Sequence, residues 1–293
     1  MTKELLSQRK VNSFSTQSSL KSDQTSQPFS LLDRISVSQI TTYHWSFAES
    51  LNGLLTADIP AVGLWNRKIL DLEPQAAAEL LIDSEIKVST VSLAGGFTGS
   101  NEYRFEDAIA DAIQLISFGG QVNADAIQIA SGPRAGHTIN HARELTIDAL
   151  KRLGDVASLT GTRLALKTMS CAEARHWTFL DSLHATLELI DDCGHPSVGL
   201  ALDAELLKQE EQPEELLSDI MPLIAAVQIS RWSPAESMSE QFPQLELLES
   251  IHSAGYRGFY DLEIWSDSVW KSDYSQLLTE MRQACQAETP EFD

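Results

Sequence analysis

The sequence is poor in cysteine and has no long apolar run, and each shortage excludes a class of protein. Its three cysteines, Cys171, Cys193 and Cys285, lack the C-x-x-C spacing of zinc knuckles and redox motifs. We therefore expect a reducing compartment, the cytoplasm, and no disulfide framework. No apolar run approaches the roughly 20 residues that a membrane-spanning helix needs, so no membrane segment is predicted.

Basic residues are also scarce: 21 Lys and Arg stand against 42 Asp and Glu, which gives a formal net charge of -21. A chain this acidic repels the phosphates of nucleic acids and of anionic membranes, so we expect neither as a partner. The simplest interpretation of the excess charge is solubility. A divalent-cation site is compatible with the charge but is not shown by it.

Residues 1–33 lack the apolar patterning of the rest of the chain. The stretch from Ser13 to Ser30 is rich in Ser, Thr and Gln, and Lys21 is its only basic residue. Such a segment cannot offset the entropy of ordering, so we predict a disordered tail at 1–33, with a short C-terminal tail at 288–293. No apolar core of a signal peptide is present, and the acidic Glu4 and Asp23 argue against an organelle-targeting segment.

From Ile35 onward, a short apolar run, a turn and a helical pattern recur eight times. The runs are nearly all apolar rather than alternating, as expected of strands that are buried on both faces. The predicted strands are 35–40, 61–65, 87–93, 126–131, 163–167, 198–203, 225–230 and 259–264. Apolar residues at helical spacing predict helices at 106–116, 143–153 and 179–190.

Eight such units in this length predict a single α/β domain over residues 34–287, a (β/α)8 TIM barrel. A doubly wound open sheet is the main alternative, but it would normally carry a Gly-rich phosphate loop after its first strand. Residues 40–44 are not such a loop. The glycines of residues 95–99 follow the third run and lack a Walker lysine, so a flexible loop is the simpler interpretation.

In this fold, the C-terminal ends of the strands carry the active site. Asp203 ends the sixth predicted strand and Glu263 lies in the eighth, so both carboxylates would project into the barrel mouth. Two convergent carboxylates can bind a divalent cation or divide acid and base roles. They can also simply form salt bridges to Lys167, at the end of the fifth strand, and to Arg231, after the seventh.

Other polar and aromatic residues at strand ends are candidates for substrate binding. An indole beside a basic residue suits a sugar or sugar phosphate, because CH groups stack on aromatic faces and arginine grips anions. Salt bridges and plain exposure are the competing explanations for the charged members. The candidates are His44, Trp65, Arg67, Arg134, Arg231 and Trp265.

Several of these segments together resemble the sugar phosphate isomerase/epimerase superfamily, the xylose isomerase-like TIM barrels. The resemblance covers about residues 34–285 and rests on the order and spacing of the segments rather than on one decisive motif. The segments that carry it are 61–68, 164–167, 198–203, 227–232 and 256–265.

The resemblance implies an enzyme of carbohydrate metabolism that moves a proton between the carbons flanking a carbonyl, through an enediolate that one divalent ion stabilises. In such families, Glu, Asp, His and Glu at the ends of strands five to eight hold that ion. By position, these ligands fall on Lys167, Asp203, Gln228 and Glu263. The usual Asp-x-x-His after strand six reads Asp-Ala-Glu-Leu at 203–206, so a histidine is lost there as well.

These departures imply a degenerate metal site. Oxygen atoms of Asp203, Gln228 and Glu263 could hold Mg²⁺ or Mn²⁺ weakly with waters, but Lys167 and Arg231 would oppose it. Two unit charges about 4 Å apart repel by about 4 kcal/mol at an effective dielectric of roughly 20. A metal-free salt-bridged cluster of Lys167, Arg231, Asp203 and Glu263 is the physically easier arrangement.

Two functions follow as hypotheses. In the first, the protein is an isomerase or epimerase of a small hydroxy-carbonyl compound, in which Glu263 or Asp203 is the base and Lys167 is the electrophile when no metal is bound. In the second, it is a non-catalytic barrel that binds a sugar-like ligand or a protein partner. The resemblance further implies that the protein is a homo-oligomer.

Overall fold

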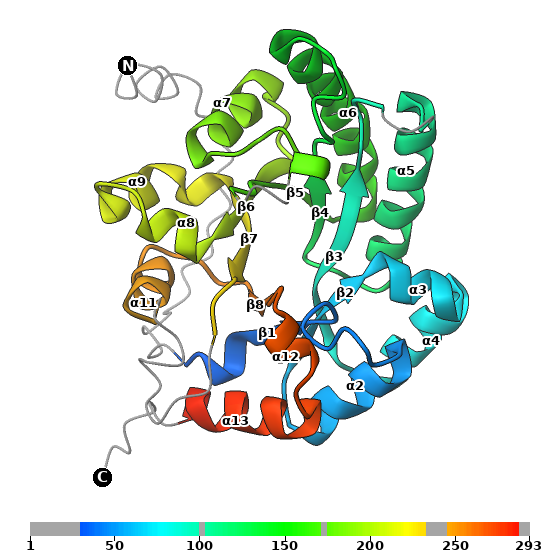
Figure 1. Ribbon diagram of the computed structural model, residues 1–293, viewed down its shortest axis with the longest axis vertical. Coiled ribbons are helices and arrows are strands. Elements are labelled where there is room, and N and C mark those ends of the chain that lie inside the picture. Colours follow the sequence, from blue (N-terminus) through cyan, green and yellow to red (C-terminus); the bar gives the residue numbers. More distant parts are fainter. Residues whose placement is uncertain (1–29, 100–102, 171–174, 233–244, 287–293) are drawn as a thin grey trace, which may run out of the picture.

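The computed structural model describes residues 30–99, 103–170, 175–232 and 245–286. Its eight parallel strands close into a barrel in sequence order, with β1 paired to β8. Helices surround this barrel on its outside (Figure 1). The structure thus confirms the predicted TIM barrel. Residues 1–29 of the predicted N-terminal tail and the predicted C-terminal tail lie outside the described residues.

The strands are short, as is usual for this fold. They are β1 (Ile35–Ser38), β2 (Ala61–Trp65), β3 (Lys87–Gly95), β4 (Ala126–Ala130), β5 (Arg163–Lys167), β6 (Val198–Asp203), β7 (Ile224–Ile229) and β8 (Tyr260–Leu262). The helices are α2 (Phe47–Thr56), α3 (Asn66–Leu72), α4 (Pro74–Ser84), α5 (Phe105–Gln121), α6 (Ile139–Thr160), α7 (Leu183–Cys193), α8 (Ala204–Lys208), α9 (Pro213–Ile220), α11 (Leu245–Ser253), α12 (Asp267–Trp270) and α13 (Tyr274–Gln286). Two 3-10 turns, η2 (Leu32–Arg34) and η4 (Met221–Leu223), precede β1 and β7.

The strand ends differ from the predicted ones by no more than two residues. The helix predicted at 179–190 is the clearest correction, because α7 begins only at Leu183. The side chain of Ser182 accepts a hydrogen bond from the backbone N–H of Ala185 and caps the helix there. Residues 179–181 instead belong to the loop that joins β5 to this cap.

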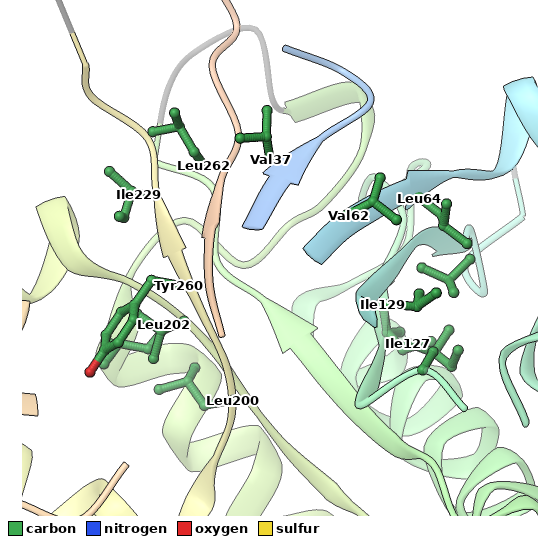
Figure 2. Packing of buried hydrophobic residues seen from close by; sticks show 14 of the residues in the cluster. Val37, Val62, Leu64, Ile127, Ile129, Leu200, Leu202, Ile229, Tyr260 and Leu262 are labelled. Carbon is green, nitrogen blue, oxygen red and sulfur yellow. The ribbon is translucent and has the colours of Figure 1, made fainter. Parts of the chain in front are cut away.

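The outer faces of the strands form the main hydrophobic core. Figure 2 shows part of it, including Val62, Leu64, Ile127 and Ile129 on one side of the barrel and Leu200 on another. Buried residues of the helices, such as Leu150 and Leu153 of α6, belong to the same cluster. Apolar burial between sheet and helices therefore holds the barrel together.

The inner faces of the strands carry small and polar side chains instead. Five alanines form a separate buried cluster: Ala126, Ala165, Ala201, Ala225 and Ala226. Buried polar side chains on the strands include Ser36, Thr90, Gln128, Gln228 and Asp261. Bulky branched residues usually fill such a barrel, so this interior leaves unusual room for polar contacts across it. Across the described residues, no helix combines the length and apolarity that a lipid bilayer crossing requires.

Candidate active site

The centre of the candidate site is an ion pair that crosses the barrel. Lys167 ends β5 and Glu263 directly follows β8, and these strands are not neighbours in the sheet. The Nζ atom of Lys167 lies 2.5 Å from Oε1 of Glu263. The two side chains are 11% and 3% exposed. The pair therefore closes over the lumen at the C-terminal mouth, where water screens it little.

The two oxygens of the Glu263 carboxylate have different surroundings. Oε1 accepts hydrogen bonds from Lys167 and from the indole N–H of Trp265, the latter at 2.9 Å. Oε2 is buried and has no hydrogen-bond partner among the described residues. A buried charged oxygen without a donor costs free energy, which a ligand, a water molecule or a proton at Oε2 would reduce.

A chain of polar groups runs from Lys167 down into the lumen. Lys167 Nζ donates to Oε1 of Gln128 at 3.3 Å, and Nε2 of Gln128 is 3.5 Å from the Thr90 hydroxyl. Thr90 in turn donates to Oδ2 of Asp261 at 2.9 Å, and Ser36 donates to Oδ1 at 2.9 Å. These contacts join β1, β3, β4, β5 and β8 across the interior.

Asp261 is a buried acid that the sequence analysis did not single out. Its burial, and next the charge of Glu263, raise the pKa of Asp261 to about 6, although the hydrogen bonds from Thr90 and Ser36 act in the opposite direction. Gly63 makes room for it, because a Cβ there would lie 2.4 Å from Oδ2 of Asp261. Residues 261 and 263 share one face of a strand, so simple alternation could have revealed this second acid.

Asp203 ends β6 and caps α8. Its Oδ1 accepts hydrogen bonds from the backbone N–H of Glu205 and from the Ser230 hydroxyl, both at 2.9 Å. Its Oδ2 has no donor among the described residues. Burial raises the pKa of Asp203 above its ordinary value, against the effect of these two hydrogen bonds. Gln228 lies beside it in the sheet, in register with Asp203 on β6 and with Asp261 on β8.

Arg231 does not join the central ion pair. Its Nη1 contacts Oε1 of Glu205 at 3.2 Å near the rim. Of the four-residue cluster expected from the sequence, the structure therefore brings Lys167 and Glu263 into an ion pair, while Asp203 is held by backbone and hydroxyl donors. The reason is reach: residue 231 lies beyond the end of β7, and its side chain extends outward over α8.

Two other predicted substrate-binding residues are exposed at the rim. His44 follows β1 and stands edge-on to Tyr43, with ring centroids 5.2 Å apart. Arg134 follows β4 and has no ion-pair or hydrogen-bond partner for its side chain among the described residues. Both remain available to a ligand, and neither contacts the Lys167–Glu263 pair.

A continuous aromatic wall adjoins the ion pair on the β8–β1–β2 side. It consists of Trp65, Tyr43, Trp270 and Trp265, with successive ring centroids 5.4, 4.8 and 6.0 Å apart. At one end of the wall, the Cζ atom of Arg67 lies 5.8 Å from the centroid of the Trp65 ring. At the other end, the indole N–H of Trp265 donates to Oε1 of Glu263. The sequence indicated the two tryptophans at strand ends. Tyr43 comes from the turn after β1 and Trp270 from the end of α12, and no local spacing could predict that these two segments meet.

The comparisons with known proteins fit this geometry. A family model described as "Xylose isomerase-like TIM barrel" matches residues 57–286, well over half of the chain. The chain belongs to this family. No curated protein matches the chain significantly.

Solved structures with the xylose isomerase-like fold are similar in shape but distant in sequence. A Sinorhizobium meliloti protein has a TM-score of 0.77 at 19% identity, covering 86% of this chain and 97% of its own. A 3-keto-D-glucoside 4-epimerase from E. coli has a TM-score of 0.68 at 15% identity, covering 86% and 97%. The IOLI protein, crystallised with a zinc atom, has a TM-score of 0.67 at 13% identity, covering 86% and 96%. At these identities, the likeness establishes the fold alone.

The divalent ion that family membership implies does not fit the residues present. Among the described residues, no group of three or more His, Cys, Asp and Glu side chains could hold a metal. The ammonium group of Lys167 lies against Glu263, where its charge would repel a metal ion, and an ammonium cannot be a ligand while charged. The neutral Gln228 amide adds no compensating charge. The carboxylates at this site are therefore better suited to pairing with the ammonium group of Lys167 than to binding a metal ion.

Restoring the carboxylate tests this explanation. We expect Lys167→Glu to bind Mn²⁺ at a site shared with Asp203, Gln228 and Glu263, whereas the wild-type chain does not. Calorimetry would show the uptake. A ligand at about 100 times its Kd stabilises a fold by about 2.7 kcal/mol, so the melting temperature of the variant should rise with Mn²⁺ by several degrees. Lys167→Gln is the matched control, and uptake by this variant as well would show that the added carboxylate is irrelevant.

Proposed function

We propose that this barrel is an isomerase or epimerase that transfers protons on a small, sugar-like hydroxy-carbonyl compound without a bound metal. The observation that carries the proposal is the divided environment of Glu263. One carboxylate oxygen is held by Lys167 and Trp265, and the other is buried without a partner among the described residues. A carboxylate fixed in this way is oriented to accept a proton from a bound ligand.

In this proposal, Glu263 is the base. Its Oε2 takes a proton from the carbon next to the substrate carbonyl; the electron pair of the broken C–H bond forms a C=C bond, and the π pair of the C=O bond moves onto the carbonyl oxygen. Oε2 then returns the proton to the former carbonyl carbon, while the hydroxyl proton of the adjacent carbon moves to the other oxygen, which completes the isomerisation.

Lys167 stabilises the negative charge that develops on the substrate oxygen. An ammonium group has three N–H donors. Two of them contact Glu263 and Gln128, and the third has no acceptor among the described residues. A fixed donor in a site of low dielectric stabilises a developing oxyanion far more than water does. Lys167 thus supplies the charge that the divalent ion supplies in metal-dependent relatives.

Asp203 is the second proton-transfer group. Its raised pKa favours the protonated form at a higher pH than for a surface aspartate, as a general acid requires. Oδ1 is held by Glu205 and Ser230, so Oδ2 is left to exchange a proton with a substrate hydroxyl. Glu263, just past β8, would then transfer the carbon-bound proton, and Asp203, at the end of β6, the hydroxyl proton.

The aromatic wall binds the substrate. The exposed Trp265 and half-buried Trp65 offer ring faces on which the CH groups of a sugar stack. Arg67, Arg134, Arg231 and His44 are the rim groups that can reach hydroxyl, carboxylate or phosphate substituents. The fold likeness to a 3-keto-D-glucoside 4-epimerase supports a carbohydrate-like substrate.

Solvent-deuterium exchange tests this function across a panel of candidate sugars. The purified protein, treated with EDTA, is incubated in D2O with ketoses, aldoses, keto sugars and their phosphates, and the loss of C–H signals is followed by NMR. We expect exchange with at least one compound and a loss of about 10²-fold or more in Glu263→Gln. Glu106→Gln, at an exposed carboxylate of α5 that pairs with Arg152, is the matched control and should retain activity.

Two outcomes would count against the proposal. Exchange that requires added Mn²⁺ in the wild-type chain would show that a metal, not Lys167, stabilises the oxyanion. Binding of a sugar without exchange under any condition would favour the alternative, a non-catalytic sugar-binding barrel. That alternative has one observation in its favour: the ion pair with Lys167 neutralises the base in the absence of substrate.

A further inference from the structure

Glu263 lies one residue past the end of β8, where the sheet holds it on one side only. Towards β7, its backbone N–H donates to the carbonyl of Ile229 at 3.0 Å. Towards β1, the last pair of the ladder is Val37 with Leu262, and β1 itself ends at Ser38. The ladder between β1 and β8 therefore stops just before the residue that carries the base.

The side chain of Thr41 continues the ladder on this side. Thr41 lies in the turn after β1, residues 39–44, and is fully buried. Its Oγ1 donates to the carbonyl of Leu262 at 2.9 Å and accepts from the backbone N–H of Ile264 at 3.0 Å. A residue of a neighbouring parallel strand would make the same two bonds with its own backbone groups. One hydroxyl thus holds the chain immediately before and after Glu263.

The direction of both hydrogen bonds is fixed by their partners. A carbonyl oxygen only accepts and a backbone N–H only donates, so the Thr41 hydroxyl must donate to Leu262 and accept from Ile264. The branched side chain of threonine also restricts the rotamers that this hydroxyl can adopt. Valine has nearly the same shape, but it would leave both buried backbone groups without this partner.

The turn that carries this hydroxyl is itself anchored to two helices. The Nζ atom of Lys68, on α3, donates to the carbonyls of Gln39 and Thr42 at 2.9 and 2.8 Å. The indole N–H of Trp270, at the end of α12, donates to the carbonyl of Ile40 at 2.9 Å. Three carbonyls of one short turn are therefore held by buried or half-buried donors, which gives the hydroxyl a fixed position.

We propose that Thr41 is a positioning residue for Glu263, an inference that rests on the proposed function of Glu263 as the base. By holding the backbone on both sides of residue 263, the hydroxyl sets where Oε2 meets the substrate carbon. A displacement of about 1 Å at a reacting atom can cost about 10²-fold in rate. Thr41 does not touch the substrate in this role, so its loss should lower kcat and leave binding at the aromatic wall nearly unchanged.

The NMR signals of lysine test this positioning without any substrate. Lys167 lies on β5, and its described contact with the segment 262–264 is the Glu263 carboxylate. In protein with ¹³C-labelled lysine, we expect Thr41→Val to shift the Cε signal of Lys167, because the carboxylate moves. Thr41→Ser keeps the hydroxyl and should leave that signal in place. Lys68, which holds the turn, should keep its signal in both variants. Lys167→Met identifies the signal of Lys167.

Deuterium exchange tests the catalytic consequence, with a compound that the wild type turns over. Thr41→Val should lower kcat at least about tenfold and change KM by less than about threefold, and Thr41→Ser should recover most of the rate. Thr146→Val removes another fully buried hydroxyl, on α6, and should match the wild type in both assays. If Thr41→Val does not fold, Thr41→Cys takes its place. A thiol is a weak donor and acceptor, so we then expect smaller changes in the same direction.

The outcomes separate this proposal from the proposed function. A wild-type protein that exchanges no compound contradicts the proposed function, whereas the lysine signals still decide whether Thr41 positions Glu263. A Lys167 signal that stays in place in Thr41→Val would overturn the positioning. So would one that moves together with the signal of Lys68, because the whole turn has then changed. A shifted Lys167 signal with an unchanged kcat would overturn the catalytic consequence.

Discussion

Replacing Glu263 by glutamine is expected to lower the free energy of unfolding by about 3–5 kcal/mol, because the ammonium group of Lys167 loses its ion-pair partner inside the barrel. The two groups are 2.5 Å apart and nearly buried. Gln128 would remain as the only described acceptor for Lys167 besides the new amide oxygen. Urea denaturation at pH 7, with fluorescence detection, measures this difference.

The double variant Lys167→Met with Glu263→Leu is the decisive control. Replacing both partners of a buried pair by apolar groups of similar size is often neutral or even stabilising. We therefore expect the double variant to unfold close to the wild type, although it has lost the catalytic groups. Glu106→Gln, which breaks the exposed pair with Arg152, should change stability little. A single variant as stable as the wild type would show that water reaches the pair and screens it.

Lys68 is expected to make the stability of the fold rise with pH between about 7 and 10. This residue of α3 is buried, and its Nζ donates to the carbonyls of Gln39 and Thr42 and to the hydroxyl of Ser50. Burial lowers the pKa of Lys68 to about 7 from 10.5, while the charge of Glu49 acts in the opposite direction. Between these two values the unfolded chain binds more protons than the folded one, so unfolding becomes harder as the pH rises.

The dependence of the free energy of unfolding on pH distinguishes Lys68 from other titrating groups. The free energy of unfolding of the wild type, minus that of Lys68→Met, should increase by up to about 1.4 kcal/mol per pH unit in this window. Subtraction of the variant removes the contribution of the buried tyrosines, which both proteins share. Parallel curves for the two proteins would show that Lys68 keeps its charge in the fold. Because Lys68 holds the loop that carries Tyr43, the same variant should weaken ligand stacking at the aromatic wall.

The strands could be predicted closely because buried parallel strands leave a strong local mark. Residues 198–202 are all apolar and Asp203 follows them. Both features can be read from the sequence without knowing how the strand pairs with its neighbours. Helix α7 was less predictable, since its apolar period continues backward past Ser182. The cap hydrogen bond at Ser182, rather than the period, decides where the helix begins.

The site was predictable only in part. Lys167, Asp203 and Glu263 lie at or just past strand ends, so the fold alone places them at the mouth. Their pairing could not be predicted, because it depends on how far each side chain reaches across the barrel lumen, and the sequence does not give these distances. Arg231, for example, pairs with Glu205 and not with the central carboxylates. Asp261 is the missed acid: alternation with Glu263 places it on the same face of the strand, and the contacts with Ser36 and Thr90 show how it is held inside the barrel.

The sequence by itself determined the barrel and its family, because apolar periodicity and strand-end chemistry are local properties. Tertiary structure alone decided that Lys167 pairs with Glu263, since β5 and β8 meet only across the closed barrel. It also decided that Oε2 of Glu263 is left buried without a partner among the described residues. These features arise from the closure of the sheet, which brings together residues that are nearly 100 positions apart in the chain.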